Sequence, residues 1–251
     1  MSSLDSRSLD SIGDNPVVLR LVPPSLPGIH PIEGGTLASR VYRELRDFLM
    51  AGQVQPGKML TLRELAAALG VSPMPVREAV QRLAAEGALE TLPNRRVRVL
   101  IVTKARFREL LEIRMSVEGL ATEKACRKIL DQDIDRMEEL NRHFALEMAK
   151  ARPDPARLFR LNKDLHYILY EAAGAPDLLS IIEGLWIKIG PLLQLSLRMR
   201  ANTRGRNPAP DWHARLIRGL RRRDPLAARR AIEGDLTSAA DQILVQGNLP
   251  D

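Results

Sequence analysis

The side chains with the clearest chemical use in this chain are Arg77, Gln81 and Arg82, which fall within one short helical pattern. A helix that carries polar and basic residues near its N-terminus can enter the major groove of DNA and read the edges of the bases. An apolar stripe at helical spacing would hold the other side of this helix against protein; it consists of Val76, Val80 and Leu83. The segment predicts a recognition helix, with an ordinary helical hairpin as the alternative.

The residues just before this helix predict the turn of a helix-turn-helix. Gly70 can adopt the positive φ with which a chain leaves a helix. Ser72 offers its hydroxyl as the N-cap of the next helix. Pro73 suits the first helical position, because a missing N–H costs nothing there.

A basic hairpin is predicted directly after the recognition helix. Pro93-Asn94 is a turn signal, and valines then alternate with arginines in the pattern of a strand that has one face on protein. The arginines at the tip and outer face would suit a phosphate backbone or a minor groove; they are Arg95, Arg96 and Arg98. The hairpin therefore has the character of a wing, and a solvated basic strand is the alternative.

Residues 36–101 as a whole resemble the winged helix-turn-helix of GntR-type bacterial transcription regulators. The matching residues are Gly52, Pro56-Gly57, Leu62, Leu65-Ala66, Leu69-Gly70-Val71-Ser72, Pro75-Val76-Arg77-Glu78-Ala79, Arg82-Leu83, Glu86-Gly87 and Pro93-Asn94-Arg95. Pro73 and Met74 stand where the family usually has Arg and Thr, and Arg96 replaces the wing glycine, so we expect an operator that differs from the family norm. The DNA-binding set that the resemblance implies is Arg63, Ser72, Met74, Arg77, Arg95, Arg96 and Arg98.

The chain from Thr103 onward is predicted to be helical throughout, which gives a mainly α protein with a C-terminal bundle of about six helices. The first of these helices is expected to direct Ile113 and Leu120 to the core side. Residues 103–246 resemble the ligand-binding FCD domain of the FadR subfamily within those regulators. The residues that carry this resemblance are Arg114, Glu118, Leu161-Asn162, His166, Glu171-Ala172-Ala173-Gly174, Trp212-His213, Arg223-Asp224-Pro225 and Ala227-Ala228-Arg229.

The FCD resemblance also implies a metal site. Many family members bind a metal through one Asp and three His, and the corresponding positions here are Asn162, His166, His213 and Asp235. The spacing fits one site, because Asn162 and His166 are four residues apart on one helix face. His213 and Asp235 lie eleven residues before and after Asp224, the turn of a predicted antiparallel hairpin.

Two imidazoles and a carboxylate suit a divalent transition metal such as Zn²⁺ with open positions, to which Asn162 could add a neutral oxygen. The alternative is a cavity without metal, in which His166 and His213 hydrogen-bond the effector directly.

The resemblance implies a homodimer on a palindromic operator, with DNA affinity controlled by a small molecule in the bundle. We expect a small carboxylate, held by Arg114, His166 and His213, because the family's effectors are usually of this kind. A metal-dependent enzyme using the His/His/Asp site is one alternative, although neither Glu-x-x-His pairs nor a general base are evident. An architectural DNA-binding protein without an effector is another.

Composition agrees with a DNA-binding protein of two domains. The chain has 251 residues and a net charge of +7, and its basic pI favours a polyanionic partner. A single cysteine, Cys126, excludes an intrachain disulfide and fits a reducing cytoplasm. Residues 1–35 are rich in Ser, Pro and Gly and are predicted to form a mobile arm. A secretory signal is not expected, because the N-terminus lacks a basic region and the apolar run at residues 17–22 is too short. A membrane span is not expected either, because charged residues and a proline interrupt the most apolar region, 178–197.

Overall fold

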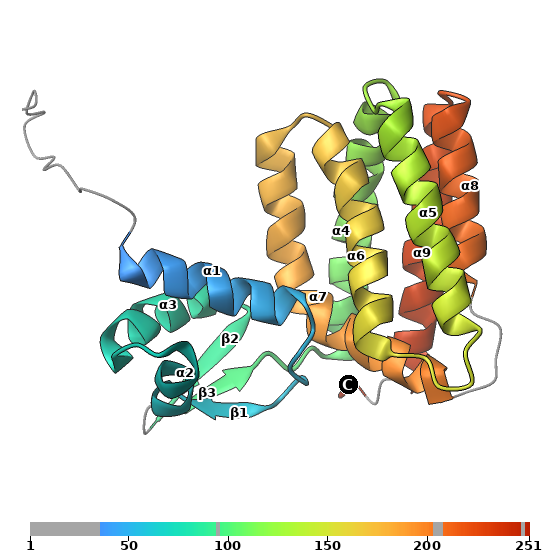
Figure 1. The fold of residues 1–251 in the computed structure, drawn as a ribbon. Coiled ribbons are helices and arrows are strands. Elements are labelled where there is room, and N and C mark those ends of the chain that lie inside the picture. The colour runs from blue at the N-terminus through green and yellow to red at the C-terminus, as the bar shows by residue number, and fades with distance from the viewer. Residues whose placement is uncertain (1–35, 94–95, 203–207, 247–248) are drawn as a thin grey trace, which may run out of the picture. The chain divides into compact units, whose positions relative to one another are not determined.

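The computed structural model describes residues 36–93, 96–202, 208–246 and 249–251. The arm predicted at residues 1–35 and the predicted wing-tip contact Arg95 lie outside the described residues. Residues 36–251 form one compact unit. In chain order its elements are α1 Leu37–Met50, β1 Met59–Thr61, α2 Leu62–Leu69, α3 Pro73–Ala85, β2 Leu89–Leu92, β3 Arg96–Val99, α4 Lys104–Cys126, α5 Asp131–Met148, α6 Pro155–Ala172, α7 Pro176–Asn202, α8 Ala209–Arg221 and α9 Pro225–Gln246 (Figure 1).

The first three helices and the sheet form the predicted winged helix-turn-helix. Helix α2 ends at Gly70, which has a φ of 65°, and α3 begins with Pro73 at its first turn, as expected from the sequence. Val76, Val80 and Leu83 are all buried in the core between α1 and α3. Ser72 does occupy the N-cap position of α3, but its hydroxyl makes no capping hydrogen bond, so that part of the prediction was wrong.

The sheet has three antiparallel strands in the order β1-β3-β2, whereas the sequence predicted only the two-stranded hairpin. The additional strand, β1, pairs with β3 through Met59 opposite Arg98 and Thr61 opposite Arg96. A strand of three residues is too short to show an alternating pattern, which explains why the sequence did not reveal it. Thr61 also caps α2 by a reciprocal pair of hydrogen bonds with Glu64, so strand and helix follow one another without a loop.

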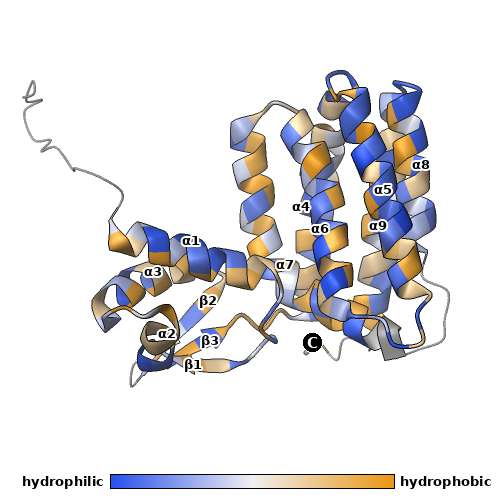
Figure 2. Cartoon of the chain, in the orientation of Figure 1, coloured by the Kyte–Doolittle hydropathy of each residue, from blue (hydrophilic) through white to orange (hydrophobic). Residues whose placement is uncertain are grey.

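Helices α4–α9 form the predicted bundle of six helices (Figure 1). Helix α9 packs on α8, α4 and α7, and α6 packs on α5, α7 and α4. Hydrophobic and hydrophilic positions alternate along most of these helices, which is typical of helices with one face in a core (Figure 2). The expected core face of α4 was wrong at two positions, because Ile113 and Leu120 are 40% and 42% exposed.

Helix α7 runs through the bundle and also contacts α1. The contact is made by backbone: a Cβ atom on Gly190 would lie 2.7 Å from the carbonyl oxygen of Leu49, and one on Gly52 would lie 2.6 Å from the carbonyl oxygen of Gly190. An ion pair between Arg46 of α1 and Glu183 of α7 adds to this junction.

The segment Pro176–Arg198 of α7 is long and apolar enough to cross a membrane when judged by length and composition alone. Half of its most apolar stretch is buried within the bundle, and core helices of soluble proteins have the same character.

Candidate functional site

Three side chains predicted as metal ligands meet in the interior of the bundle. His166 comes from α6, His213 from α8 and Asp235 from α9, and all three are buried. One potential ligand atom from each lies within 4.8 Å of the others. The Nε2 atoms of His166 and His213 are 3.3 Å and 3.7 Å from the two carboxylate oxygens of Asp235. The structure therefore brings together three residues that are far apart in sequence; the symmetry about Asp224 concerned His213 and Asp235 alone.

The hydrogen bonds of His166 determine which of its ring nitrogens carries the proton. Its Nδ1 atom is 2.9 Å from the hydroxyl oxygen of Tyr170, and that hydroxyl donates its own hydrogen to Glu118. The carboxylate of Glu118 is also bonded by Arg114, so it acts as the acceptor. The Tyr170 oxygen must then accept from Nδ1–H, which leaves a lone pair on Nε2 of His166.

His213 is oriented in the same way by a different partner. The Asn141 amide donates to the carbonyl oxygen of Pro210 at 3.0 Å, so its carbonyl oxygen is turned toward Nδ1 of His213 at 3.1 Å. Nδ1–H is the donor in this contact, and the lone pair of His213 again lies on Nε2. Burial lowers the pKa of His213 to about 4, which keeps its ring neutral and able to bind a metal.

The arrangement leaves both Nε2 atoms without a hydrogen-bond partner among the described residues. Burial by itself would raise the pKa of Asp235, but nearby positive charge, which includes Arg114, keeps it below its usual value, so the carboxylate is ionised at neutral pH. Two unpartnered lone pairs and a carboxylate converge on one buried point, and a buried polar atom without a partner is costly. A divalent cation at this point would satisfy all three groups, so the donor set fits a metal.

A small cavity adjoins the trio, and Asn162, the predicted fourth ligand, lines it together with His166, Asp235 and Arg114. Its volume is about 40 Å³, which is room for a few water molecules at roughly 10–15 Å³ each. Ser196 of α7 adds a polar group to the wall.

Arg114, the predicted effector ligand, lines this cavity but is already engaged by Glu118. Its Nε atom is 2.7 Å from one carboxylate oxygen, and a terminal nitrogen is 3.3 Å from the other. Both side chains are buried, and the pair leaves Arg114 with only part of its hydrogen-bonding capacity for an anion.

Sequence reasoning missed Tyr170 and Asn141, the residues that orient the two histidines. Tyr170 lies four residues after His166 on the same helix, so the helical period could have identified it. Asn141 lies on α5, 72 residues before His213, and no local pattern links the two.

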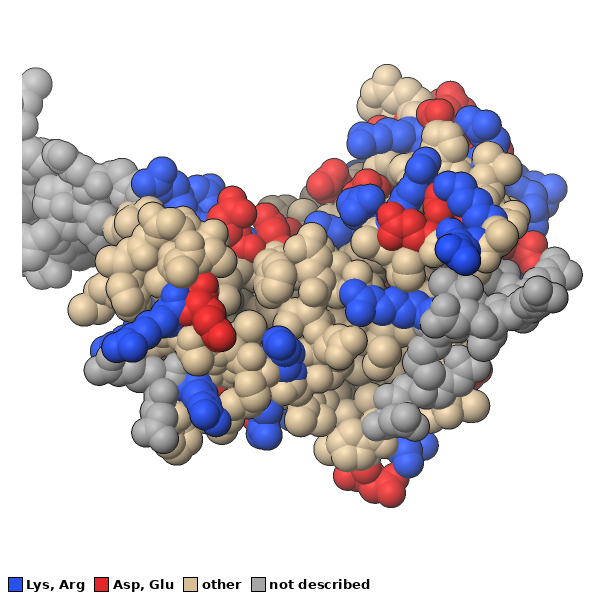
Figure 3. Space-filling view, turned by 60° about the horizontal axis from the view of Figure 1, so that its bottom comes forward, with Lys and Arg blue, Asp and Glu red and all other residues tan. Residues whose placement is uncertain are grey.

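The described residues of the predicted DNA-binding set lie along the start of α2, the start of α3 and the wing, and all except the half-buried Arg98 are exposed. Arg63, Met74 and Arg77 all have exposed side chains, and the wing residue Arg96 is exposed as well. Figure 3 shows basic side chains set in uncharged surface over this part of the molecule, with a few acidic groups beside them, whereas basic and acidic groups are more closely mixed over the bundle.

Two arginines of the winged helix are engaged within the protein. Arg98 is bonded to Glu90, its cross-strand partner, at 2.8 Å. Arg82 lies over the ring of Tyr42 at 3.8 Å and pairs with Glu86. Arg77 therefore differs from Arg82 in having no such partner among the described residues.

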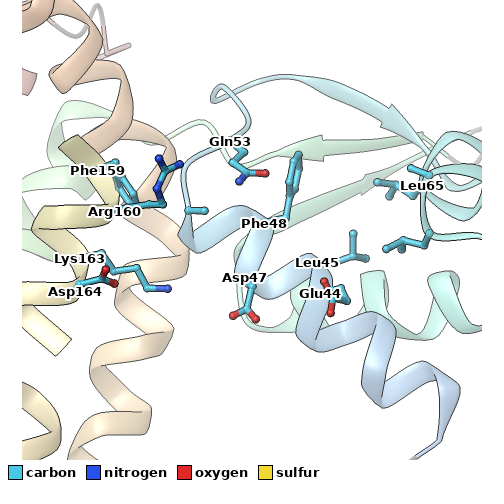
Figure 4. Close-up of a pocket in the computed structure, with 13 residues that line it drawn as sticks. Glu44, Leu45, Asp47, Phe48, Gln53, Leu65, Phe159, Arg160, Lys163 and Asp164 are labelled. Carbon is cyan, nitrogen blue, oxygen red and sulfur yellow. The ribbon is translucent and has the colours of Figure 1, made fainter. Parts of the chain in front are cut away.

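A larger hollow of about 570 Å³ lies between α1 and α2 on one side and α6 on the other (Figure 4). Asp47 and Phe48 of α1 line it, as do Phe159 and Lys163 of α6. Within the part of the chain that the structure describes, His166, His213 and Asp235 are the one group of three or more His, Cys, Asp or Glu side chains that could hold a metal ion. This group does not line the hollow.

Comparison with known proteins agrees with both halves of the structure. Residues 37–99 match the model of bacterial regulatory proteins of the gntR family, and residues 109–238, just over half of the chain, match the FCD domain. The HTH-type transcriptional regulator McbR of Escherichia coli is 28% identical over 207 residues, which cover 82% of this chain and 92% of McbR. The Nta operon transcriptional regulator of Aminobacter aminovorans is 30% identical over 132 residues, 52% of this chain and 61% of that protein.

The solved structure of E. coli McbR/YncC superposes with a TM-score of 0.76 at 27% identity and covers 85% of this chain and 99% of its own. A putative GntR regulator from Rhodococcus has the same fold, with a TM-score of 0.65 at 23% identity over 83% of this chain and 98% of its own. The relatives are named as transcriptional regulators, which disagrees with the alternative of a metal-dependent enzyme. A winged helix-turn-helix followed by an FCD bundle places this chain in the GntR family of transcriptional regulators, among the members that carry an FCD domain.

Proposed function

We propose that this regulator binds a palindromic operator as a homodimer and that a divalent metal with a small carboxylate ligand in the bundle controls its affinity for DNA. The observation that carries the metal is the pair of unpartnered Nε2 atoms, from His166 and His213, facing the carboxylate of Asp235. Without a cation, these groups would repel one another in a dry site. Acting on DNA, such a protein works in the cytoplasm.

His166, His213 and Asp235 would hold the metal, and Asn162 is placed on the same cavity to add a fourth, neutral ligand. The metal would supply a positive charge for an anionic ligand in open coordination positions. Tyr170 and Asn141 keep the two imidazoles in the tautomer that ligation requires. Because the cavity is small, the effector is small, and a carboxylate can also use the part of Arg114 that Glu118 leaves free.

Elemental analysis of protein purified without a histidine tag tests the metal. Wild type should carry about one divalent ion per chain, and His213→Ala should lose at least about tenfold in affinity, since a ligand is removed. His143→Ala is the matched control, because His143 lies on α5 outside the trio and its loss should leave the metal content unchanged. Wild type that neither carries nor takes up a metal would contradict this half of the proposal, and the histidines would then bind the effector directly.

Exposed apolar side chains on α4 and α7 support the dimer. Ile113 and Leu120 are seven residues apart on one face of α4, and Ile181 of the neighbouring α7 is 53% exposed. Apolar residues grouped on one face mark surfaces that associate. A palindromic operator follows from a two-fold dimer of winged helices.

Analytical ultracentrifugation of Leu120→Glu should give monomers at concentrations where wild type is dimeric. Leu146→Glu, at a 57% exposed position of α5, introduces the same charge away from this face and should leave the dimer intact. If both variants remain dimers, the association face lies elsewhere.

A further inference from the structure

A second, separate pocket lies on the hairpin of α8 and α9, and we call it the arginine pocket. It has a volume of about 290 Å³, close to the lower end of the roughly 300–1,000 Å³ typical of ligand pockets. Its charged and aromatic lining residues are Trp212, Arg215, Arg218, Arg222, Asp224 and Arg230. Four guanidinium groups thus face one small hollow that contains one carboxylate.

The other arginines of this hairpin are neutralised by acidic neighbours. Arg221 bonds to Asp135 and Glu138 of α5, and Arg229 is bonded to Glu123 and Glu233. The chain therefore places carboxylates opposite the arginines that face the bundle.

The arginines of the pocket lack this compensation. Arg218, Arg222 and Arg230 have no carboxylate within ion-pair distance in the part of the chain that the structure describes, and Arg215 lies 4.5 Å over the ring of Trp212. The one carboxylate, Asp224, uses an oxygen to cap α9 through the backbone N–H of Ala227. A concentrated and uncompensated positive charge remains on a concave surface.

We propose that the arginine pocket binds a diphosphate group, either as free pyrophosphate or as part of a nucleotide. Guanidinium groups bind phosphate oxygens through paired hydrogen bonds, and several of them around one hollow match an anion that carries several charges. The small volume favours a compact anion. A DNA contact is disfavoured by location, because α8 and α9 pack on α4, α5 and α7 and lie on the side of the bundle away from α1–α3 (Figure 1).

Isothermal titration of the full-length protein with inorganic pyrophosphate tests this site. Arg222→Ala and Arg230→Ala should each weaken binding by about tenfold, the loss expected for one strong charge-assisted contact. Arg221→Ala is the matched control: it removes the same charge from the adjacent residue, which faces Asp135 instead of the pocket, and binding should change by less than about twofold.

Titration with ADP distinguishes free pyrophosphate from a nucleotide as the ligand. Tighter binding of ADP than of pyrophosphate would identify the ligand as a nucleotide, and equal binding would identify it as the free anion. Absence of pyrophosphate binding to wild type overturns the proposal. An equal loss of pyrophosphate affinity in Arg221→Ala and Arg222→Ala also overturns it, because the loss would then come from the lower net charge of the protein and not from the pocket. If Arg222→Ala weakens binding to a random DNA duplex instead, the surface contacts nucleic acid and the diphosphate proposal fails.

Discussion

The two halves of this regulator place their functional side chains in opposite ways. In the winged helix, Arg63 and Arg77 are exposed and are positioned by the helices on which they lie. In the bundle, His166, His213 and Asp235 are buried and come from three helices. Exposed side chains on a local scaffold can change without cost to the fold, whereas buried polar groups from distant segments are part of the core. Substitutions that change DNA specificity should therefore leave the stability of the fold unchanged, whereas substitutions at the buried effector site should also change stability.

The largest effect is expected at the buried pair of Arg114 and Glu118. Arg114→Met would leave the carboxylate of Glu118, which is 0% exposed, without its cation, so we expect a loss of about 3–5 kcal/mol in the free energy of unfolding. Arg142→Met, which breaks an exposed pair with Glu139, should cost less than about 1 kcal/mol. Urea unfolding followed by circular dichroism measures both; equal stability of the two variants would remove the expected contrast between buried and exposed charged side chains.

At Arg77 we expect a loss of DNA affinity without a loss of stability. Arg77→Ala should weaken operator-specific binding by about 1–3 kcal/mol, because an exposed side chain at the start of α3 is lost from the base edges. The thermal midpoint of unfolding should stay at the wild-type value. A gel-shift titration with operator and random DNA, run beside thermal unfolding, checks both parts. Unchanged specific affinity in folded protein would show that Arg77 does not read the operator.

Acid should destabilise the bundle through His213. Its pKa is about 4 in the folded protein and about 6.5 in an unfolded chain, so between these values only the unfolded state binds the proton. Stability of the metal-free protein is therefore highest above about pH 6.5 and falls as the pH drops toward 4, by up to about 1.4 kcal/mol per pH unit. In His213→Gln this dependence should be weaker. Denaturant unfolding after chelation, between about pH 7 and pH 5, compares the two slopes, and parallel curves would contradict the assignment.

The smallest effect is expected in the salt dependence of DNA binding, which should differ between variants of two arginines of the wing. Arg96 is exposed, whereas Arg98 is bonded to Glu90. If Arg96 contacts a phosphate, Arg96→Ala should reduce the slope of log affinity against log salt by about 0.9. Arg98→Ala should reduce it less, because its charge is already compensated. Binding to random DNA at several salt concentrations measures the slopes, and an equal reduction would indicate that Glu90 releases Arg98 when DNA binds.

The sequence predicted what has a local or symmetric pattern. Gly70 and Pro73 indicated the turn, and the equal distances of His213 and Asp235 from Asp224 indicated that the two would meet across the hairpin. Pairings between distant segments have no such pattern. Neither strand β1 nor the contact of Asn141 with His213 could be predicted, because each depends on how separate elements pack. The exposed apolar face of α4 was mistaken for core for a related reason: helical periodicity identifies an apolar stripe but does not say what covers it.

The contact between Gly52 and Gly190 bears on how such regulators can be recombined. Backbone meets backbone there, so a side chain at either position would meet a carbonyl oxygen that cannot move aside easily. A chimera that joins this DNA-binding half to another sensor also needs glycine at both positions of this contact. A correctly joined linker between the halves does not remove that need. The interchangeable unit is then larger than the winged helix alone: it includes the surface of α7 on which the end of α1 rests. Engineers who exchange sensors between regulators of this kind should carry the glycine pair across together.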